Sequence, residues 1–157
     1  MKILLIQIEK TTDLYLVEGI KIYTERLKNY IQLSTETIVM PKAVRQKPVD
    51  EQKRAEASEI IKLLEPSDYL ICMDEHGKQF TSIQFSEFLN KRMVSGCKRL
   101  VFLIGGPYGI DSSILQKGSY TLSLSDMTFS HQMIRLFFNE QLYRGFSILK
   151  NEKYHHE

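Results

Sequence analysis

The sequence predicts an α/β fold of three layers, with a largely parallel sheet between two layers of helices. Short apolar segments alternate with longer amphipathic segments along the chain, in the order βαβαβαβαβα. The short segments are too uniformly apolar to expose one side to water, which is typical of buried parallel strands. No repeat, linker or low-complexity tract divides the 157 residues, so we expect a single domain spanning 1–157.

The strands are short and rich in branched or aromatic residues, and polar or turn-forming residues bound them. Pro41 ends the second strand, and a Pro-Ser-Asp turn at 66–68 precedes the third. We expect the strands at residues 3–8, 35–40, 69–73, 100–104 and 120–124.

The helices are indicated by apolar residues that recur every three or four positions. The first shows this spacing from Leu16 to Tyr30, and Thr11 or Thr12 is its expected N-cap. Thr81 or Ser82 caps the third, which ends near residue 94. The other helices are expected at 50–64, 113–117 and 130–149.

Composition excludes several classes of protein. No apolar run approaches the roughly 20 residues that a membrane span needs, and the first six residues are too short and too soon polar for a signal peptide. Cys72 and Cys97 are expected to be free thiols, and no Cys/His cluster has the spacing of a metal site. We therefore expect a cytoplasmic protein that binds no metal and no membrane.

A net charge of +2 gives no overall sign of nucleic-acid binding. The segment 41–54 is locally basic, with five basic residues against two acidic ones, a net excess of three positive charges. Both a solvated surface and a phosphate-binding patch explain it. The basic residues are Lys42, Arg45, Lys47, Lys53 and Arg54.

Ligands of open α/β sheets bind beyond the carboxyl ends of the strands. The fourth strand ends in Gly105-Gly106-Pro107-Tyr108-Gly109, which matches neither a dinucleotide fingerprint nor a Walker loop. Three glycines in five residues permit close approach of a ligand to the backbone, but they also suit a tight turn. Either role is open from the residues alone.

The last helix is apolar on two sides, whereas packing on one sheet face needs a single stripe. A subunit interface is the natural second partner, and Phe138 is our candidate to face it. Glu140 and Arg144 are spaced to form an ion pair. Composition alone predicts a frayed end for 153–157 and a structural role for His131.

Four ordered motifs carry a resemblance over essentially the whole chain. They are FLIGGPYG at 102–109, LSLSDMTFSHQ at 122–132, EQLYR at 140–144 and the Tyr-His pair at 154–155. In these motifs the chain resembles the RlmH (YbeA) family of SPOUT methyltransferases. Two positions depart from the usual family pattern: Ser130 replaces a proline, and His156-Glu157 follows the Tyr-His pair.

The resemblance implies a SPOUT domain with a C-terminal trefoil knot, which topological rules would otherwise disfavour. It implies a homodimer that methylates N3 of a pseudouridine in 23S (large-subunit) ribosomal RNA, on the assembled ribosome. It also implies S-adenosylmethionine as cofactor. Carried over residue by residue, the cofactor contacts are Met73, Gly105, Leu124, Ser125, Asp126, Met127, Thr128 and Phe129.

The resemblance also suggests catalytic roles at the end of the chain. The imide proton of a uracil ring leaves only well above neutral pH, so a base or a positive field is required. His155 is our candidate for proton handling, Tyr154 for holding the base, and Arg144 for stabilising negative charge or binding phosphate.

Two alternative functions remain open. The altered tail is compatible with a ribosome- or RNA-binding module of the same fold that has no catalytic activity. An α/β enzyme for a small nucleotide-like ligand is less favoured, because phosphate-binding motifs are absent from the sequence.

Overall fold

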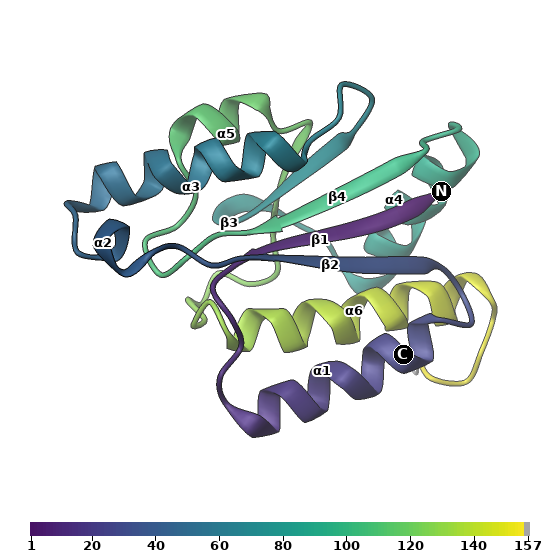
Figure 1. Cartoon of the computed structure of the whole chain (residues 1–157). Coiled ribbons are helices and arrows are strands. Elements are labelled where there is room, and N and C mark those ends of the chain that lie inside the picture. The colour runs from purple at the N-terminus through teal and green to yellow at the C-terminus, as the bar shows by residue number, and fades with distance from the viewer. Residues whose placement is uncertain (156–157) are drawn as a thin grey trace.

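The computed structural model describes residues 1–155. A five-stranded parallel sheet in the order β2-β1-β4-β3-β5 lies between two layers of helices (Figure 1), so the predicted three-layer α/β class is confirmed. The strands are β1 (Lys2–Ile8), β2 (Gln32–Ile38), β3 (Tyr69–Gln79), β4 (Arg99–Ile104) and β5 (Tyr120–Ser123). The helices are α1 (Leu14–Leu27), α2 (Lys42–Arg45), α3 (Val49–Leu63), α4 (Ser82–Val94), α5 (Ser112–Lys117) and α6 (Met133–Leu149).

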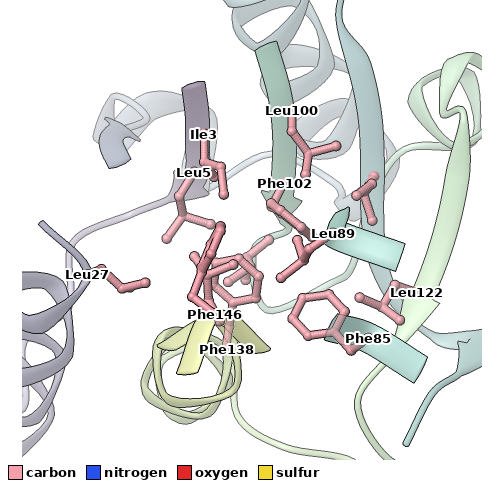
Figure 2. Close-up of a cluster of buried hydrophobic side chains, with 13 residues drawn as sticks. Ile3, Leu5, Leu27, Phe85, Leu89, Leu100, Phe102, Leu122, Phe138 and Phe146 are labelled. Carbon is pink, nitrogen blue, oxygen red and sulfur yellow. The ribbon is translucent and has the colours of Figure 1, made fainter. Parts of the chain in front are cut away.

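Alternate residues of the central strands divide the core into two halves. On one face, Ile3, Leu5 and Phe102 pack against residues of α1, α4 and α6 (Figure 2). On the other face, Leu4 and Leu103 pack against α3 and α5. Strands buried on both faces are the expected consequence of a parallel sheet covered by helices.

Phe138 belongs to the first half of the core. It is fully buried, and its ring centroid lies 4.7 Å from that of Phe102 on β4. The prediction that Phe138 faces a partner subunit is therefore wrong, because this side of α6 packs on its own sheet. The neighbouring Phe137 is 40% exposed and is the outward-facing aromatic of the pair.

Two strands differ from the sequence prediction. β2 begins three residues earlier than expected, because the edge of the sheet leaves much of it exposed and polar residues are tolerated there. β3 extends six residues past Met73 through an irregularity in its pairing with β5, after which Lys78 pairs with Leu122. The polar sequence of 74–79 carries no strand pattern that could have predicted this extension.

The N-terminal caps of two helices differ in how well the sequence predicted them. Thr81 forms a reciprocal capping box with Gln84 at the start of α4, as predicted. The expected cap of α1 by Thr11 or Thr12 is wrong, since Asp13 holds that position without a side-chain bond. Thr11 instead accepts a hydrogen bond from Arg135 (2.9 Å), so it ties the start of α1 to α6.

Candidate functional site

A cavity of about 870 Å³ lies at the carboxyl ends of β3, β4 and β5. All strand pairs in the sheet are parallel, so the segments that follow these three strands meet at one edge. The cavity walls come from residues 73–76, 104–110, 122–125 and 127–131, with contributions from α3, α5 and α6. This volume falls within the roughly 300–1,000 Å³ typical of small-molecule sites.

The glycine-rich segment after β4 is both a tight turn and a wall of this cavity. The Gly109 amide donates to the Gly106 carbonyl (3.0 Å), and Gly109 has a φ of 78°, which favours glycine. A Cβ on Gly105 would lie 2.9 Å from the backbone of Gly109. Gly105 is therefore required by the turn itself, and a side chain there would displace the loop before it filled the cavity.

Hydrogen bonds within the chain shape the loop after β5. The Ser123 hydroxyl donates to the Ser125 carbonyl (2.8 Å), and the Met127 amide donates to the Ser125 hydroxyl (2.9 Å). The Thr128 hydroxyl donates to the Glu75 carboxylate (2.8 Å), which joins this loop to the extended part of β3. The loop is thus held in a defined shape around the cavity.

Seven of the eight residues predicted to contact the cofactor line the cavity. Asp126 is the exception, because its carboxylate accepts a hydrogen bond from Gln79 and it does not reach the wall. The seven that line it are Met73, Gly105, Leu124, Ser125, Met127, Thr128 and Phe129.

Other residues line the cavity without having been predicted as site residues, and Lys53, Tyr108 and His131 are among them. Burial, and then the charge of Arg135, lower the pKa of His131 and favour its neutral form. Arg135 is fully buried and donates to the Ile8 carbonyl. The position of His131 beside the loop, four residues before Arg135, was visible in the sequence, but the burial of Arg135 depends on how α6 packs.

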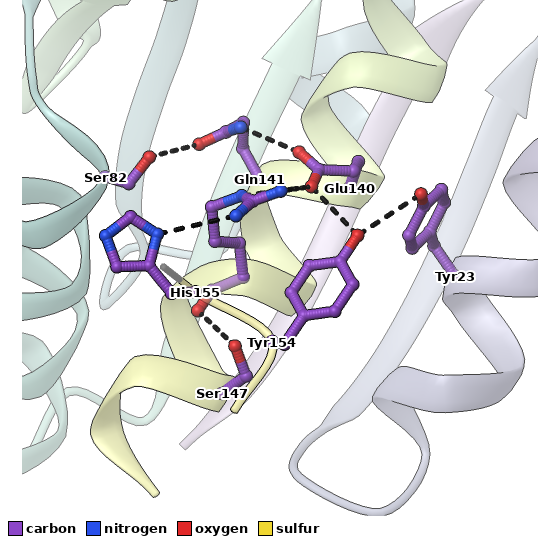
Figure 3. Close-up of polar contacts among 8 residues, drawn as sticks. Tyr23, Ser82, Glu140, Gln141, Ser147, Tyr154 and His155 are labelled. Atoms are coloured by element: carbon purple, nitrogen blue, oxygen red, sulfur yellow. Dashed lines mark hydrogen bonds and ion pairs between the residues drawn. The ribbon is translucent and has the colours of Figure 1, made fainter. Parts of the chain in front are cut away.

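The residues predicted to be catalytic form a separate cluster near the end of α6 (Figure 3). Glu140 joins them: the Tyr154 hydroxyl donates to its carboxylate (3.1 Å), and Arg144 forms an ion pair with the same oxygen (2.5 Å). The Arg144 guanidinium lies 4.7 Å from the centre of the Tyr154 ring and 3.4 Å from the His155 imidazole. The Tyr154 hydroxyl also lies 3.4 Å from that of Tyr23 on α1.

These contacts decide two predictions about the end of the chain. The predicted Glu140–Arg144 pair is confirmed. A frayed end is the wrong description for Tyr154 and His155, because both contact α6. His156 and Glu157 lie outside the described residues.

Within one chain, the cluster and the cavity are far apart. Ile134 of α6 lines the cavity, and Arg144 follows ten residues later on the same helix. At a rise of about 1.5 Å per residue, this separates them by about 15 Å. Figure 1 likewise shows the segment that follows α6 leaving the opposite end of that helix from the loops after β4 and β5. The structure therefore does not bring Arg144, Tyr154 and His155 to the cavity of their own chain.

Comparison with known proteins gives the family. The model of a predicted SPOUT methyltransferase family matches residues 1–155. The chain belongs to the SPOUT methyltransferase family. A ribosomal RNA large subunit methyltransferase H from Parabacteroides distasonis is 52% identical over the full length of both chains, and one from Flavobacterium psychrophilum is 51% identical, also over both full lengths.

A solved structure supports the fold. A probable methylase family protein from Haemophilus influenzae matches 99% of this chain and 70% of its own, with a TM-score of 0.50 and 15% sequence identity. Within residues 1–155, no helix of this SPOUT chain is long and apolar enough to span a membrane. The same residues contain no group of three or more metal-ligating side chains.

Proposed function

We propose that this SPOUT protein transfers a methyl group from S-adenosylmethionine to N3 of a pseudouridine in large-subunit ribosomal RNA, on the assembled ribosome. The observation that carries the proposal is the cavity, which lies at the carboxyl edge of a parallel sheet and is lined by seven of the residues expected to contact the cofactor. The names of the full-length relatives support the RNA substrate. A ribosomal substrate would place the protein in the cytoplasm.

The lining of the cavity fits S-adenosylmethionine. Met73, Leu122, Leu124 and Ile134 offer apolar surface for an adenine ring, while the glycine turn and the loop after β5 form much of the remaining wall. Carboxylates at Asp74 and Glu75 suit a ligand that carries positive charge. The bound cofactor would supply an electrophilic methyl group, and no metal is needed for its transfer.

The chain's own residues must orient the base and accept its proton. Tyr154 and Arg144 offer an aromatic ring with a hydroxyl and a fixed cation, and His155 offers an imidazole next to that cation. Burial, followed by hydrogen bonds to Tyr23 and Glu140, raises the pKa of Tyr154, so this residue remains a neutral phenol. Tyr154 is thus suited to hold the RNA base in place and not to accept its proton.

A homodimer would resolve the separation between the cluster and the cavity. About 15 Å along α6 prevents one chain from placing His155 at its own cavity. A second copy packed on the exposed side of α6 could bring its Arg144, Tyr154 and His155 to this cavity. Phe137 and Phe129, whose ring centroids lie 4.8 Å apart, provide exposed apolar surface beside the cavity for such a contact.

Mass-spectrometric mapping of ribosomal RNA tests this function. Cells that lack the gene should lose the methyl group on one pseudouridine of the large-subunit RNA, and the wild-type gene should restore it. An unchanged modification pattern would reject the proposed substrate. A lost methyl group on a different nucleotide would keep the methyltransferase and reject the N3-pseudouridine target.

A further inference from the structure

The tip of the glycine turn presents an exposed aromatic side chain at the mouth of the cavity. Tyr108 lines the cavity and is nevertheless 52% exposed, whereas Gly105 and Gly106 beside it are buried. An exposed ring at the entrance to a binding site is available to a second, larger ligand. The proposed reaction requires such a ligand, since an RNA base has to approach the cofactor.

The backbone holds this ring in place. The Gly109 amide bonds to the Gly106 carbonyl (3.0 Å), and the two residues form an antiparallel bridge across the turn. A Cβ on Gly105 would already be too close to the Gly109 backbone, so the two sides of the turn are tightly packed. A ring on so constrained a turn loses little conformational entropy when a flat ligand stacks on it.

Positive charge lies next to the same rim. Lys53 of α3 lines the cavity, and Glu56, one helical turn later, lies against Gly106 at the base of the turn. Neither Lys53 nor Arg54 forms an ion pair within the described part of the chain. The nearby Asp111 offsets part of this charge, but its carboxylate is engaged by the amide and hydroxyl of Ser113.

We infer that Tyr108 and Lys53 form an RNA-binding rim, on which an unpaired base next to the target nucleotide stacks while a neighbouring phosphate contacts Lys53. Stacking on an aromatic ring combined with a lysine-phosphate contact is the usual chemistry of single-stranded RNA recognition. This inference rests on the proposed function, and it assigns the basic start of α3 to the substrate.

Steady-state methylation of ribosomes and calorimetry with S-adenosylmethionine test the role of Tyr108. Tyr108→Ala should raise the KM for ribosomes at least about fivefold, the low end for a lost base–aromatic stack, and leave the cofactor affinity unchanged. Tyr108→Phe keeps the ring and should behave like the wild type. An unchanged KM in Tyr108→Ala, or a loss of cofactor affinity that accounts for the defect, would overturn the assignment.

The salt dependence of RNA binding tests the role of Lys53. For a single-stranded RNA fragment of the target loop, Lys53→Ala should reduce the slope of log affinity against log salt by about 0.7 to 1, as expected for one lost phosphate contact. Lys62→Ala, an exposed lysine at the other end of α3, is the matched control and should leave the slope unchanged. Equal slopes for Lys53→Ala and the wild type would refute the phosphate contact.

The RNA-binding measurement also distinguishes a failure of this inference from a failure of the proposed function. Suppose that Lys53→Ala reduces the slope of log affinity against log salt, but the wild type transfers no methyl group. The proposed reaction is then wrong, and the RNA-binding rim is supported. If methyl transfer is normal and neither variant changes KM or slope, the rim fails and the reaction stands.

Discussion

The two ends of α6 carry the two halves of the proposed active site, and they are built in different ways. At the N-terminal end, the cavity is formed mainly by the loops that follow β3, β4 and β5. At the C-terminal end, Arg144, Tyr154 and His155 form a cluster of side chains that depends on where the chain folds back. The position of the cavity is determined by where the strands end, whereas the cluster is determined by contacts between side chains.

This difference indicates which half can work alone. The walls of the cavity come from the loops at one edge of the sheet and from residues of α3, α5 and α6, all within one chain. Within the cluster, Glu140 pairs with Arg144 and accepts a hydrogen bond from Tyr154. The cluster lies about 15 Å along α6 from the cavity. We therefore expect cofactor binding to depend on the first half alone, and methyl transfer to depend on both halves and on a second copy of the chain.

Removal of the tail should produce the largest effect. Deletion of residues 154–157 should reduce methyl transfer at least about a hundredfold, the low end of what a positioned acid or base supplies. Cofactor affinity should stay nearly unchanged, because neither Tyr154 nor His155, the two tail residues that the structure describes, lines the cavity. Single-turnover methylation of ribosomes at saturating cofactor measures the first quantity, and calorimetric titration measures the second.

Tyr30→Phe is a suitable control for this deletion. Tyr30 donates to Glu152 just before the tail, so the variant perturbs the same region while Tyr154, His155 and Arg144 remain. It should retain methyl transfer close to the wild-type rate. A truncated protein that transfers methyl at the full rate would show that the cluster plays no part in the reaction.

The sequence predicted the cavity better than the cluster for a physical reason. Parallel strands end at a common edge, so Met73, Gly105 and Leu124 could be grouped from strand positions alone. The packing of Tyr154 against Tyr143 and Arg144 depends on the path of residues 150–153, which no periodic pattern encodes. The same limit explains why the β3 extension and the outward position of Phe137 were missed, whereas the fold class and the Thr81 cap were found.

The glycine turn offers the next largest effect, this time on the cavity end. Gly105→Ala places a Cβ within 2.9 Å of the Gly109 backbone, and relief of that contact must shift the turn. We expect the affinity for S-adenosylmethionine to fall at least about tenfold, equivalent to about 1.4 kcal/mol. Calorimetric titration measures the loss, and circular dichroism checks that the fold is retained.

Gly19→Ala is the matched glycine control. Its Cβ would meet the flexible end of the Leu136 side chain, away from the cavity, so cofactor affinity should be preserved. If Gly105→Ala also binds the cofactor normally, the turn does not form part of the cofactor site. The assignment of the cavity to the cofactor would then be wrong.

The dimer can be tested at the exposed side of α6. Phe137→Asp should weaken self-association at least about tenfold, because it puts a charge into the apolar surface that Phe137 and Phe129 present. Sedimentation should report about twice the 18.4 kDa chain mass for the wild type and a shift toward the monomer for the variant. Phe138→Asp should instead unfold the protein, since that ring is fully buried. A wild-type protein that is monomeric at micromolar concentration would contradict an active site that combines the cavity of one chain with the cluster of a second copy.

The smallest effect should come from Glu56, a buried carboxyl group beneath the glycine turn. Burial, followed by the charge of Glu9, raises the pKa of Glu56 from 4.5 to about 7. Between these values the folded protein binds a proton that the unfolded chain does not. The favourable contribution of Glu56 is therefore complete below about pH 4.5 and is lost as the pH rises through about 7.

Glu56→Gln should remove this dependence, because the amide stays neutral at every pH. Denaturant unfolding should show the variant to be more stable than the wild type at pH 8 by on the order of 1 kcal/mol, with no advantage at pH 4. Glu59→Gln on the same helix is the control, since Glu59 is more exposed and pairs with Lys62; it should change stability by less than about 0.5 kcal/mol at either pH. Equal stability of Glu56→Gln and the wild type at pH 8 would mean that the carboxylate ionises beneath the turn without penalty. In that case the base of the cavity would have to admit water or a cation next to Gly106, where α3 packs against the glycine turn.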